Sequence, residues 1–157
     1  MLDPRHLRKY VIKPVLQKLS TVFVGCDSLA AENLMLGTAA VESGLKYLHQ
    51  IRGPALGLWQ VEPVTHQDVL VYLRRKGNQE GRVVDGFRAS VGGWEEQLTW
   101  NLRYCCAIAR IKYWMDPEPL PKSNDIDGLA IYWKRVYNSR HGRGSPSAFI
   151  EAYQRLS

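Results

Sequence analysis

Glu42 is the side chain of this sequence best placed for acid–base chemistry. It stands in the last turn of a helix predicted over residues 28–44, SLAAENLMLGTAAVESG, and residues 34–41 of that helix are almost entirely apolar. A helix that is apolar on every side is buried on every side. Burial and the negative end of the helix dipole should both raise the pKa of Glu42, which would let it act as a general acid near neutral pH. The alternative is an ordinary glutamate that points into water.

This predicted helix has sequence signals at both of its ends. Asp27 or Ser28 can cap its first turn, and Gly44 can supply the left-handed residue that ends it. Upstream, the periodicity predicts an amphipathic helix over residues 6–19, which Pro14 would kink or delay. We therefore expect residues 28–44 to form the central helix of the domain.

The chain after the central helix begins with a loop-rich interval. Gly and Pro residues punctuate residues 53–63, which predicts a loop or a short hairpin. Thr65 and Asp68 have the spacing of a capping box and would open a helix that Gly77 ends. Residues 78–93 are polar and rich in glycine, a composition that predicts a surface excursion.

Apolar residues at helical spacing and capping residues predict three further helices. The first is predicted over residues 95–115 and the second over residues 125–136. Ser145 as cap and Pro146 as first helical residue open the last one. The fold class is therefore mainly α, a single domain over residues 1–157. We expect at most a small β element, in the loop after the central helix or in the glycine-rich excursion.

Composition excludes several classes of function. The chain has 157 residues and a net charge of +6, but its basic residues are scattered and only Arg74, Arg75 and Lys76 are adjacent, so no nucleic-acid partner is expected. Three cysteines, two of them at neighbouring positions, make no disulfide framework and match no metal spacing. The neighbouring pair, Cys105 and Cys106, is best explained as part of the core. No stretch is apolar and long enough for stable membrane insertion, and the first residues lack the apolar core of a signal peptide.

The histidines suggest neither a metal centre nor a catalytic triad. His49, His66 and His141 have no partner at a suitable spacing, and we assign all three to the surface. No cofactor is implied by any motif.

Three segments taken together resemble the soluble lytic transglycosylases of the lysozyme-like superfamily. The first is Glu42-Ser43, similar to the Glu-Ser pair that ends the family's buried helix. The second is residues 53–65, GPALGLWQVEPVT, similar to the family's Gly-Leu-Met-Gln and Pro-x-Thr segment with Trp59 in the methionine position. The third is Tyr137-Asn138, followed by a glycine-rich loop. Asn101-Leu102 is a weaker match to the family's Asn-Ile, and order and spacing agree over about residues 29–153.

The resemblance implies a lysozyme-like fold whose central buried helix carries the catalytic acid. It implies cleavage of the β-1,4 bond between N-acetylmuramic acid and N-acetylglucosamine in peptidoglycan, without water, to give 1,6-anhydro ends. Glu42 would act first as acid and then as base, and the Tyr137 hydroxyl would hydrogen-bond and orient it. The substrate-binding residues would be Ser43, Trp59, Gln60 and Asn138.

The partners implied are peptidoglycan glycan strands. Because the first residues lack a signal sequence, the chain resembles a phage-borne member of the family, with other virion proteins as further partners. It would be made in the cytoplasm and brought to the cell wall by another factor.

Each of these side chains also has a plainer interpretation. Tyr137 can be the last apolar contact of its helix, and Asn138 a left-handed residue that ends it. Gln60 can be a solvated loop residue, and Trp59 part of the core.

Two other functions stay open at this point. A goose-type lysozyme of the same fold would use water and a second carboxylate about 6.5–9.5 Å from the first. The candidates for that carboxylate are Glu62, Asp68, Asp85 and Glu95. The second alternative is a virion structural or wall-binding protein that kept the fold and lost turnover.

Overall fold

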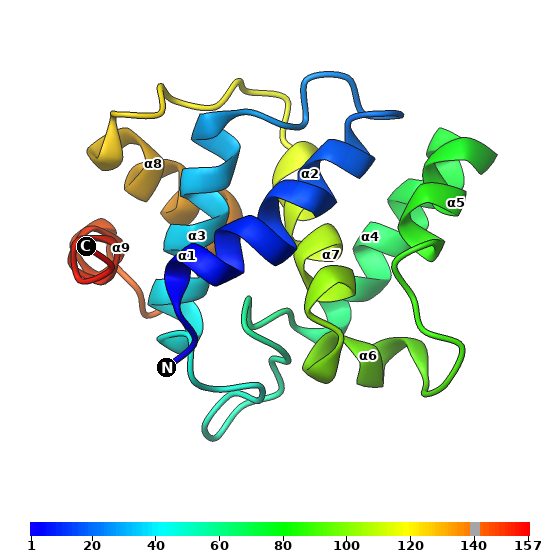
Figure 1. The fold of residues 1–157 in the computed structure, drawn as a ribbon, viewed down its shortest axis with the longest axis horizontal. Coiled ribbons are helices and arrows are strands. Elements are labelled where there is room, and N and C mark those ends of the chain that lie inside the picture. Colours follow the sequence, from blue (N-terminus) through cyan, green and yellow to red (C-terminus); the bar gives the residue numbers. More distant parts are fainter. Residues whose placement is uncertain (139–141) are drawn as a thin grey trace.

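Helices joined by loops make up the chain in the computed structural model, which describes residues 1–138 and 142–157 (Figure 1). Helix α3, Leu29–Ser43, occupies the middle of the molecule. Its packing partners include α7 (Leu102–Trp114), α8 (Ile126–Trp133) and α9 (Pro146–Gln154). In the described ranges no β-strand forms, and the loop after α3 makes only isolated antiparallel bridges, both at Leu56. The predicted class, mainly α with at most a small β element, is confirmed.

Both predicted ends of the central helix are confirmed. Ser28 is extended and its Oγ accepts a hydrogen bond from the backbone N–H of Ala31, while Gly44 is left-handed at φ 61°. Every side chain from Leu34 to Ala40 is buried. The helix also needs Gly37, because a Cβ atom there would collide with the ring of Phe149 on α9.

The N-terminal segment is helical without interruption but changes its winding before Pro14. It consists of α1 (Pro4–Leu7), a π-helical turn η1 (Arg8–Ile12) and α2 (Lys13–Leu19). In the wider turn the N–H of Lys13 bonds to the carbonyl of Arg8, five residues back. Because proline has no N–H and its ring crowds the preceding turn, a π-helical turn at this place accommodates Pro14 without breaking the helix.

Helix α4, Pro63–Lys76, begins before the predicted capping box. Its N-cap is Glu62 and Pro63 is its first residue, so the prediction that Thr65 and Asp68 open the helix is wrong. Proline at the first helical position explains the earlier start, since that position needs no N–H and favours the fixed φ of proline. Gly77 ends the helix as predicted, at φ 136°.

Two predictions for the middle of the chain are also corrected. Residues 78–93 contain helix α5, Asn78–Asp85, rather than only a surface loop. The helix predicted over residues 95–115 is two helices, α6 (Trp94–Trp100) and α7, divided at Asn101. There the backbone leaves helical geometry at ψ 92°, and the Asn101 side chain accepts the N–H of Tyr104 and donates to the Phe87 carbonyl. An asparagine that bonds the backbone in this way favours a new cap over a continuous helix.

The last part of the chain follows the predicted order. Helix α8 continues into a second π-helical turn, η2 (Lys134–Asn138). Helix α9 opens with Ser145 as its cap and Pro146 in its first turn, as predicted, and it packs on both α3 and α8.

Buried apolar side chains from these helices form one cluster. Cys26, Cys105 and Cys106 belong to it and are free thiols, which confirms the core role expected of Cys105 and Cys106. None of the described helices combines the length and the hydropathy that a bilayer-spanning segment needs.

Candidate active site

Glu42 lies half-buried in the last turn of α3. Its Oε1 accepts a hydrogen bond of 3.1 Å from the indole Nε1 of Trp133, at the end of α8. Burial raises the pKa of Glu42 to about 7; the hydrogen bond from Trp133 opposes this rise, and the nearby charge of Glu62 adds to it. A carboxylic acid with that pKa is substantially protonated at neutral pH, so it can donate a proton and take one back.

A groove passes Glu42 on both sides. One half is a cavity of about 670 Å³ toward η2 and the start of α4, and the other is a cavity of about 700 Å³ toward α9 and the N-terminus. The residues common to both halves are Val41, Glu42, Gln50, Gln60 and Ala148. The carboxyl group therefore lies along an extended groove, where a polymeric ligand can continue past it in both directions.

Tyr137 does not make the hydrogen bond that the resemblance implies. Its hydroxyl donates to the backbone carbonyl of Trp59 at 2.6 Å, and the group that bonds Glu42 is Trp133. The Tyr137 ring stacks on Tyr113, with centroids 5.0 Å apart. Burial raises the pKa of Tyr137, and the charge of Glu42 raises it further. Tyr137 still lines the groove beside Glu42, but its hydroxyl holds the loop that precedes Gln60 rather than the acid.

Trp59 and Ser43 do not offer their side chains to a ligand. Trp59 has no exposed surface and its Nε1 donates to the Met35 carbonyl at 2.9 Å, so the prediction that it binds substrate is wrong and its core interpretation is correct. A tryptophan ring that is fully buried contributes a large apolar area to the core. Ser43 is also buried, and its Oγ donates to the Ala39 carbonyl one turn earlier. Ser43 borders the α9 half of the groove, with its hydroxyl already bonded.

Gln60 and Asn138 do lie on the groove. Gln60 is largely buried, has a left-handed backbone at φ 48°, and donates from Nε2 to the Gly57 carbonyl. Its amide oxygen is the side-chain atom left for a ligand. Asn138 lines the η2 half, where its Oδ1 accepts from Lys134 Nζ at 2.7 Å.

One of the four candidates for a second carboxylate reaches the groove. Glu62 is exposed and lines the same half as Glu42, whereas Asp68, Asp85 and Glu95 line neither half. Of these four, Glu62 alone is placed to act as a second carboxylate, and Glu151 on α9 is a further carboxylate that lines the other half of the groove.

The histidines are placed differently from one another. His49 is exposed, as predicted, but His66 is buried, which corrects its assignment to the surface. A ring nitrogen of His66 lies 2.7 Å from the Tyr104 hydroxyl, and burial lowers the pKa of His66 to about 4. His141 lies outside the described residues. In the described part of the chain no three His, Cys, Asp or Glu side chains are grouped closely enough to hold a metal ion.

Trp133, Lys112 and Arg143 line the groove without having been predicted as site residues from the sequence. Trp133 falls within the helix predicted over residues 125–136, and nothing in its spacing from Glu42, 91 positions away, indicates a hydrogen bond between them. Lys112 and Arg143 line the η2 half of the groove and give it positive charge. Their only sequence signal is a basic residue near a helix end or in a glycine-rich loop, which is common on any surface.

No protein-family model, curated protein or solved structure matches this chain.

Proposed function

We propose that the chain is a lysozyme-like domain that cleaves peptidoglycan glycan strands by lytic transglycosylation, with Glu42 as the single acid–base residue. The observation that supports this most is the position of Glu42, a carboxylic acid with a pKa of about 7 that lies along a groove open on both sides of it. The family assignment itself comes from the sequence resemblance.

The hydrogen bond from Trp133 supports a definite place for the proton. An indole N–H is only a donor, so Oε1 of Glu42 must accept and the acidic proton belongs on Oε2. In the proposed first step Oε2–H protonates the glycosidic oxygen as the C1–O bond breaks. Trp133 holds the carboxyl group in place, which reduces the cost of positioning the acid.

The second step returns the proton to Glu42. The carboxylate accepts the proton of the muramic C6 hydroxyl while that oxygen bonds to C1. Over the two steps the C1–O bond to the leaving sugar and the C6 O–H bond break, a C1–O6 bond and the O–H of the leaving sugar form, and no water enters. The substrate's acetamido group can stabilise C1 between the two steps, as in substrate-assisted glycosidases. One protein carboxyl group is therefore sufficient, and its pKa near neutrality suits both directions of transfer.

The walls of the groove suit a sugar polymer with anionic substituents. Gln60 and Asn138 place amide groups along it, and Lys112 and Arg143 place two cationic groups in its η2 half. Peptidoglycan carries carboxylates on its peptide stems, which cations at the edge of a groove would attract. A role at the start of phage infection or at host lysis, with virion proteins as partners, is a prediction from the resemblance alone.

A water-using muramidase is the second candidate, and Glu62 favours it. This carboxylate lines the same half of the groove as Glu42 and its charge raises the pKa of Glu42. In an inverting hydrolase a second carboxylate of this kind would activate a water molecule on the opposite face of the sugar. A wall-binding protein without turnover is the third candidate, although a binder has no need of a protonated acid in its groove.

Digestion of purified peptidoglycan followed by mass spectrometry distinguishes the three. Transglycosylation leaves 1,6-anhydro ends, which are lighter than reducing ends by one water. We expect anhydro ends from the wild type and no soluble fragments from Glu42→Gln. Reducing ends that disappear in Glu62→Gln would establish the hydrolase instead. Binding without soluble fragments from the wild type would establish the wall-binding protein.

A further inference from the structure

The N-terminal end of α3 borders a cavity that the proposed reaction does not use. Its volume is about 630 Å³, and it shares no lining residue with either half of the groove around Glu42. Ser28 and Glu42 are separated by nearly the full length of the helix, roughly 21 Å at 1.5 Å per residue. Ligands at this cavity and in the groove would therefore not contact one another.

A buried arginine without a carboxylate partner lines this cavity. Arg110, on α7, is 2% exposed, and its Nε donates to the Cys26 carbonyl at 3.2 Å. Within residues 1–138 and 142–157 this is its only hydrogen bond, and no carboxylate lies within ion-pair distance of it. A guanidinium has five N–H donors, so most of its capacity remains for a ligand. Burying such a charge without a counter-ion is costly, and an anion in the cavity would remove that cost.

The start of α3 adds a second set of donors to the same cavity. Ser28 and Ala30 line it, and Ser28 Oγ satisfies only the N–H of Ala31. The amides of Leu29 and Ala30 have no acceptor among the described residues. A long helix has positive character at this end, which attracts anions. Lys76, in the last turn of α4, lines the cavity as well and adds a further positive charge.

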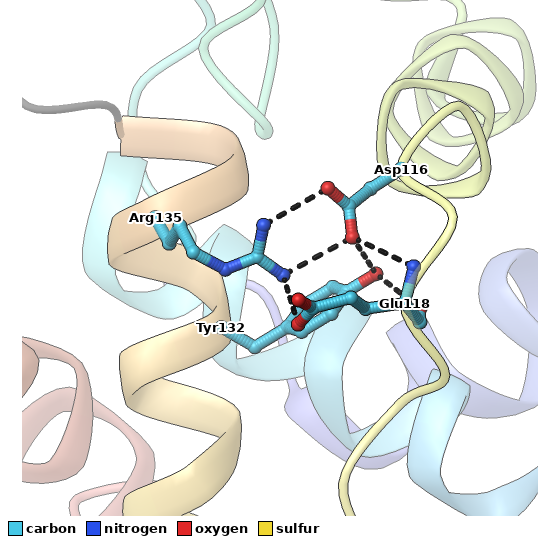
Figure 2. Close-up of polar contacts among 4 residues, drawn as sticks. All are labelled: Asp116, Glu118, Tyr132 and Arg135. Carbon is cyan, nitrogen blue, oxygen red and sulfur yellow. Dashed lines mark hydrogen bonds and ion pairs between the residues drawn. The ribbon is translucent and has the colours of Figure 1, made fainter.

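The two acidic side chains that line the same cavity, Asp116 and Glu118, already have a partner. Figure 2 shows Arg135 reaching across from η2 to Asp116 and Glu118. Its two terminal nitrogens lie 2.9 and 3.1 Å from the two oxygens of Asp116, and the second also bonds Glu118. Tyr132 donates to both of these residues, which fixes the wall further. Arg135 neutralises one of these two negative charges and bonds oxygens of both side chains, and neither carboxylate bonds Arg110.

We propose that this cavity binds an oxyanion, a carboxylate or a phosphate, held by Arg110, Lys76 and the first free amides of α3. The aromatic side chains of Tyr72 and Trp114 also line the cavity and would pack against the part of the ligand that carries the anion. The site is separate from glycan cleavage, so it would bind its ligand whether or not the proposed function is correct.

An NMR titration of the ¹⁵N-labelled protein tests this directly. Sodium phosphate and sodium acetate would be added separately, with sodium chloride used to keep the ionic strength constant. We expect saturable shifts of the Leu29 and Ala30 amides and of the Arg110 Nε–H. Saturation by phosphate alone identifies a phosphate site, and saturation by acetate alone identifies a carboxylate site. Linear, unsaturated shifts with both anions, or saturable shifts only elsewhere, would overturn the proposal.

Two variants keep the test independent of folding defects. Ala30→Asp places a carboxylate at the cavity, in a helix position that favours acidic residues, so the fold should be retained and saturable binding abolished. Lys76→Gln removes one exposed charge and should weaken binding by about three- to tenfold. The matched control is Lys18→Gln, at an exposed lysine that does not line the cavity, which should leave the dissociation constant unchanged. Unaltered binding in Ala30→Asp would rule out this site.

Discussion

The indole Nε1 of Trp133 lies 3.1 Å from Oε1 of Glu42, joining the end of α8 to the end of the central helix. This contact opposes the effect of burial, because a hydrogen bond to a carboxylate favours its charged form. The pKa of about 7 results from burial, from this opposing hydrogen bond and from the nearby charge of Glu62, which raises it further. The same contact leaves the other oxygen of Glu42 to carry the proton.

Replacing Trp133 by phenylalanine removes this hydrogen bond while keeping an aromatic ring against Phe149. The pKa of Glu42 should then rise further. In the wild type kcat/KM should fall tenfold per pH unit above about 7, as the acid ionises. In Trp133→Phe this alkaline limb should move to higher pH, and the rate at neutral pH should fall about three- to tenfold because the carboxyl group is less well oriented.

Trp100→Phe, at a partly exposed tryptophan, is the control and should leave the pH profile unchanged. An alkaline limb that stays in place in Trp133→Phe would show that Trp133 does not act on the acid.

Replacing Glu42 by glutamine should abolish cleavage and stabilise the fold in a pH-dependent way. The loss of the acid should cost at least ~10²-fold in rate. Burial raises the pKa of Glu42 from 4.5 to about 7, so between these values the folded protein binds more protons than the unfolded chain. The free energy of unfolding of the wild type therefore falls as pH rises through this window. Relative to wild type, the free energy of unfolding of Glu42→Gln should be higher by about 2–3 kcal/mol at pH 8 and almost unchanged at pH 4.

Urea unfolding at the two pH values measures this gain. Glu95→Gln, at an exposed glutamate in the first turn of α6, serves as the control and should show no such difference. Equal gains for Glu42→Gln at both pH values would contradict a raised pKa.

Local signals were enough to predict the part of the fold that carries Glu42. The caps at Ser28 and Gly44, and the Ser145-Pro146 start of α9, depend on neighbouring residues only, and the structure has all of them. The division at Asn101 was not predictable in the same way. Its side chain bonds the carbonyl of Phe87, and that partner is brought close only by the fold.

The site was predicted less completely, for the same physical reason. The pattern of α3 is sufficient to predict a raised pKa for Glu42, because burial on all sides follows from apolar residues on all sides. The partners of Tyr137 and Trp59 are backbone carbonyls distant in sequence, which no spacing rule selects. Residue type alone also could not distinguish a tryptophan that binds sugar from one that fills a core.

Tyr137→Phe tests whether the loop before Gln60 must be held for turnover. The change removes the hydroxyl that donates to the Trp59 carbonyl and leaves the ring stacked on Tyr113. An unsatisfied buried carbonyl costs about 1–3 kcal/mol, so the thermal midpoint should fall. If loss of this hydrogen bond also lets the loop shift and displaces Gln60, the rate of cleavage should fall by roughly 5- to 150-fold.

The matched control is Tyr153→Phe on α9, where the ring stacks on Phe149 and the described residues give the hydroxyl no hydrogen bond. It should keep both its stability and its turnover. A Tyr137→Phe protein with a lowered midpoint but full activity would confine Tyr137 to a structural role.

His66 should make the fold sensitive to acid. It is 1% exposed, its ring contacts the Tyr104 hydroxyl, and burial lowers its pKa from 6.5 to about 4. Between these values the unfolded chain binds the proton and the folded protein does not, so the free energy of unfolding falls as pH falls from 6.5 to 4. Because Glu42 acts in the opposite direction over much of this range, the contribution of His66 must be measured as a difference between variants.

His66→Gln can keep a hydrogen bond to Tyr104 and cannot take up the proton. Measured by urea unfolding, its stability relative to wild type should improve by about 1–2 kcal/mol between pH 7 and pH 4. The exposed His49, replaced by glutamine in the same way, should show no comparable change, because its ring is in water in both states. If the stability difference between His66→Gln and wild type stays constant from pH 7 to pH 4, the His66 ring takes up its proton as readily in the folded protein as in the unfolded chain, and the prediction is wrong.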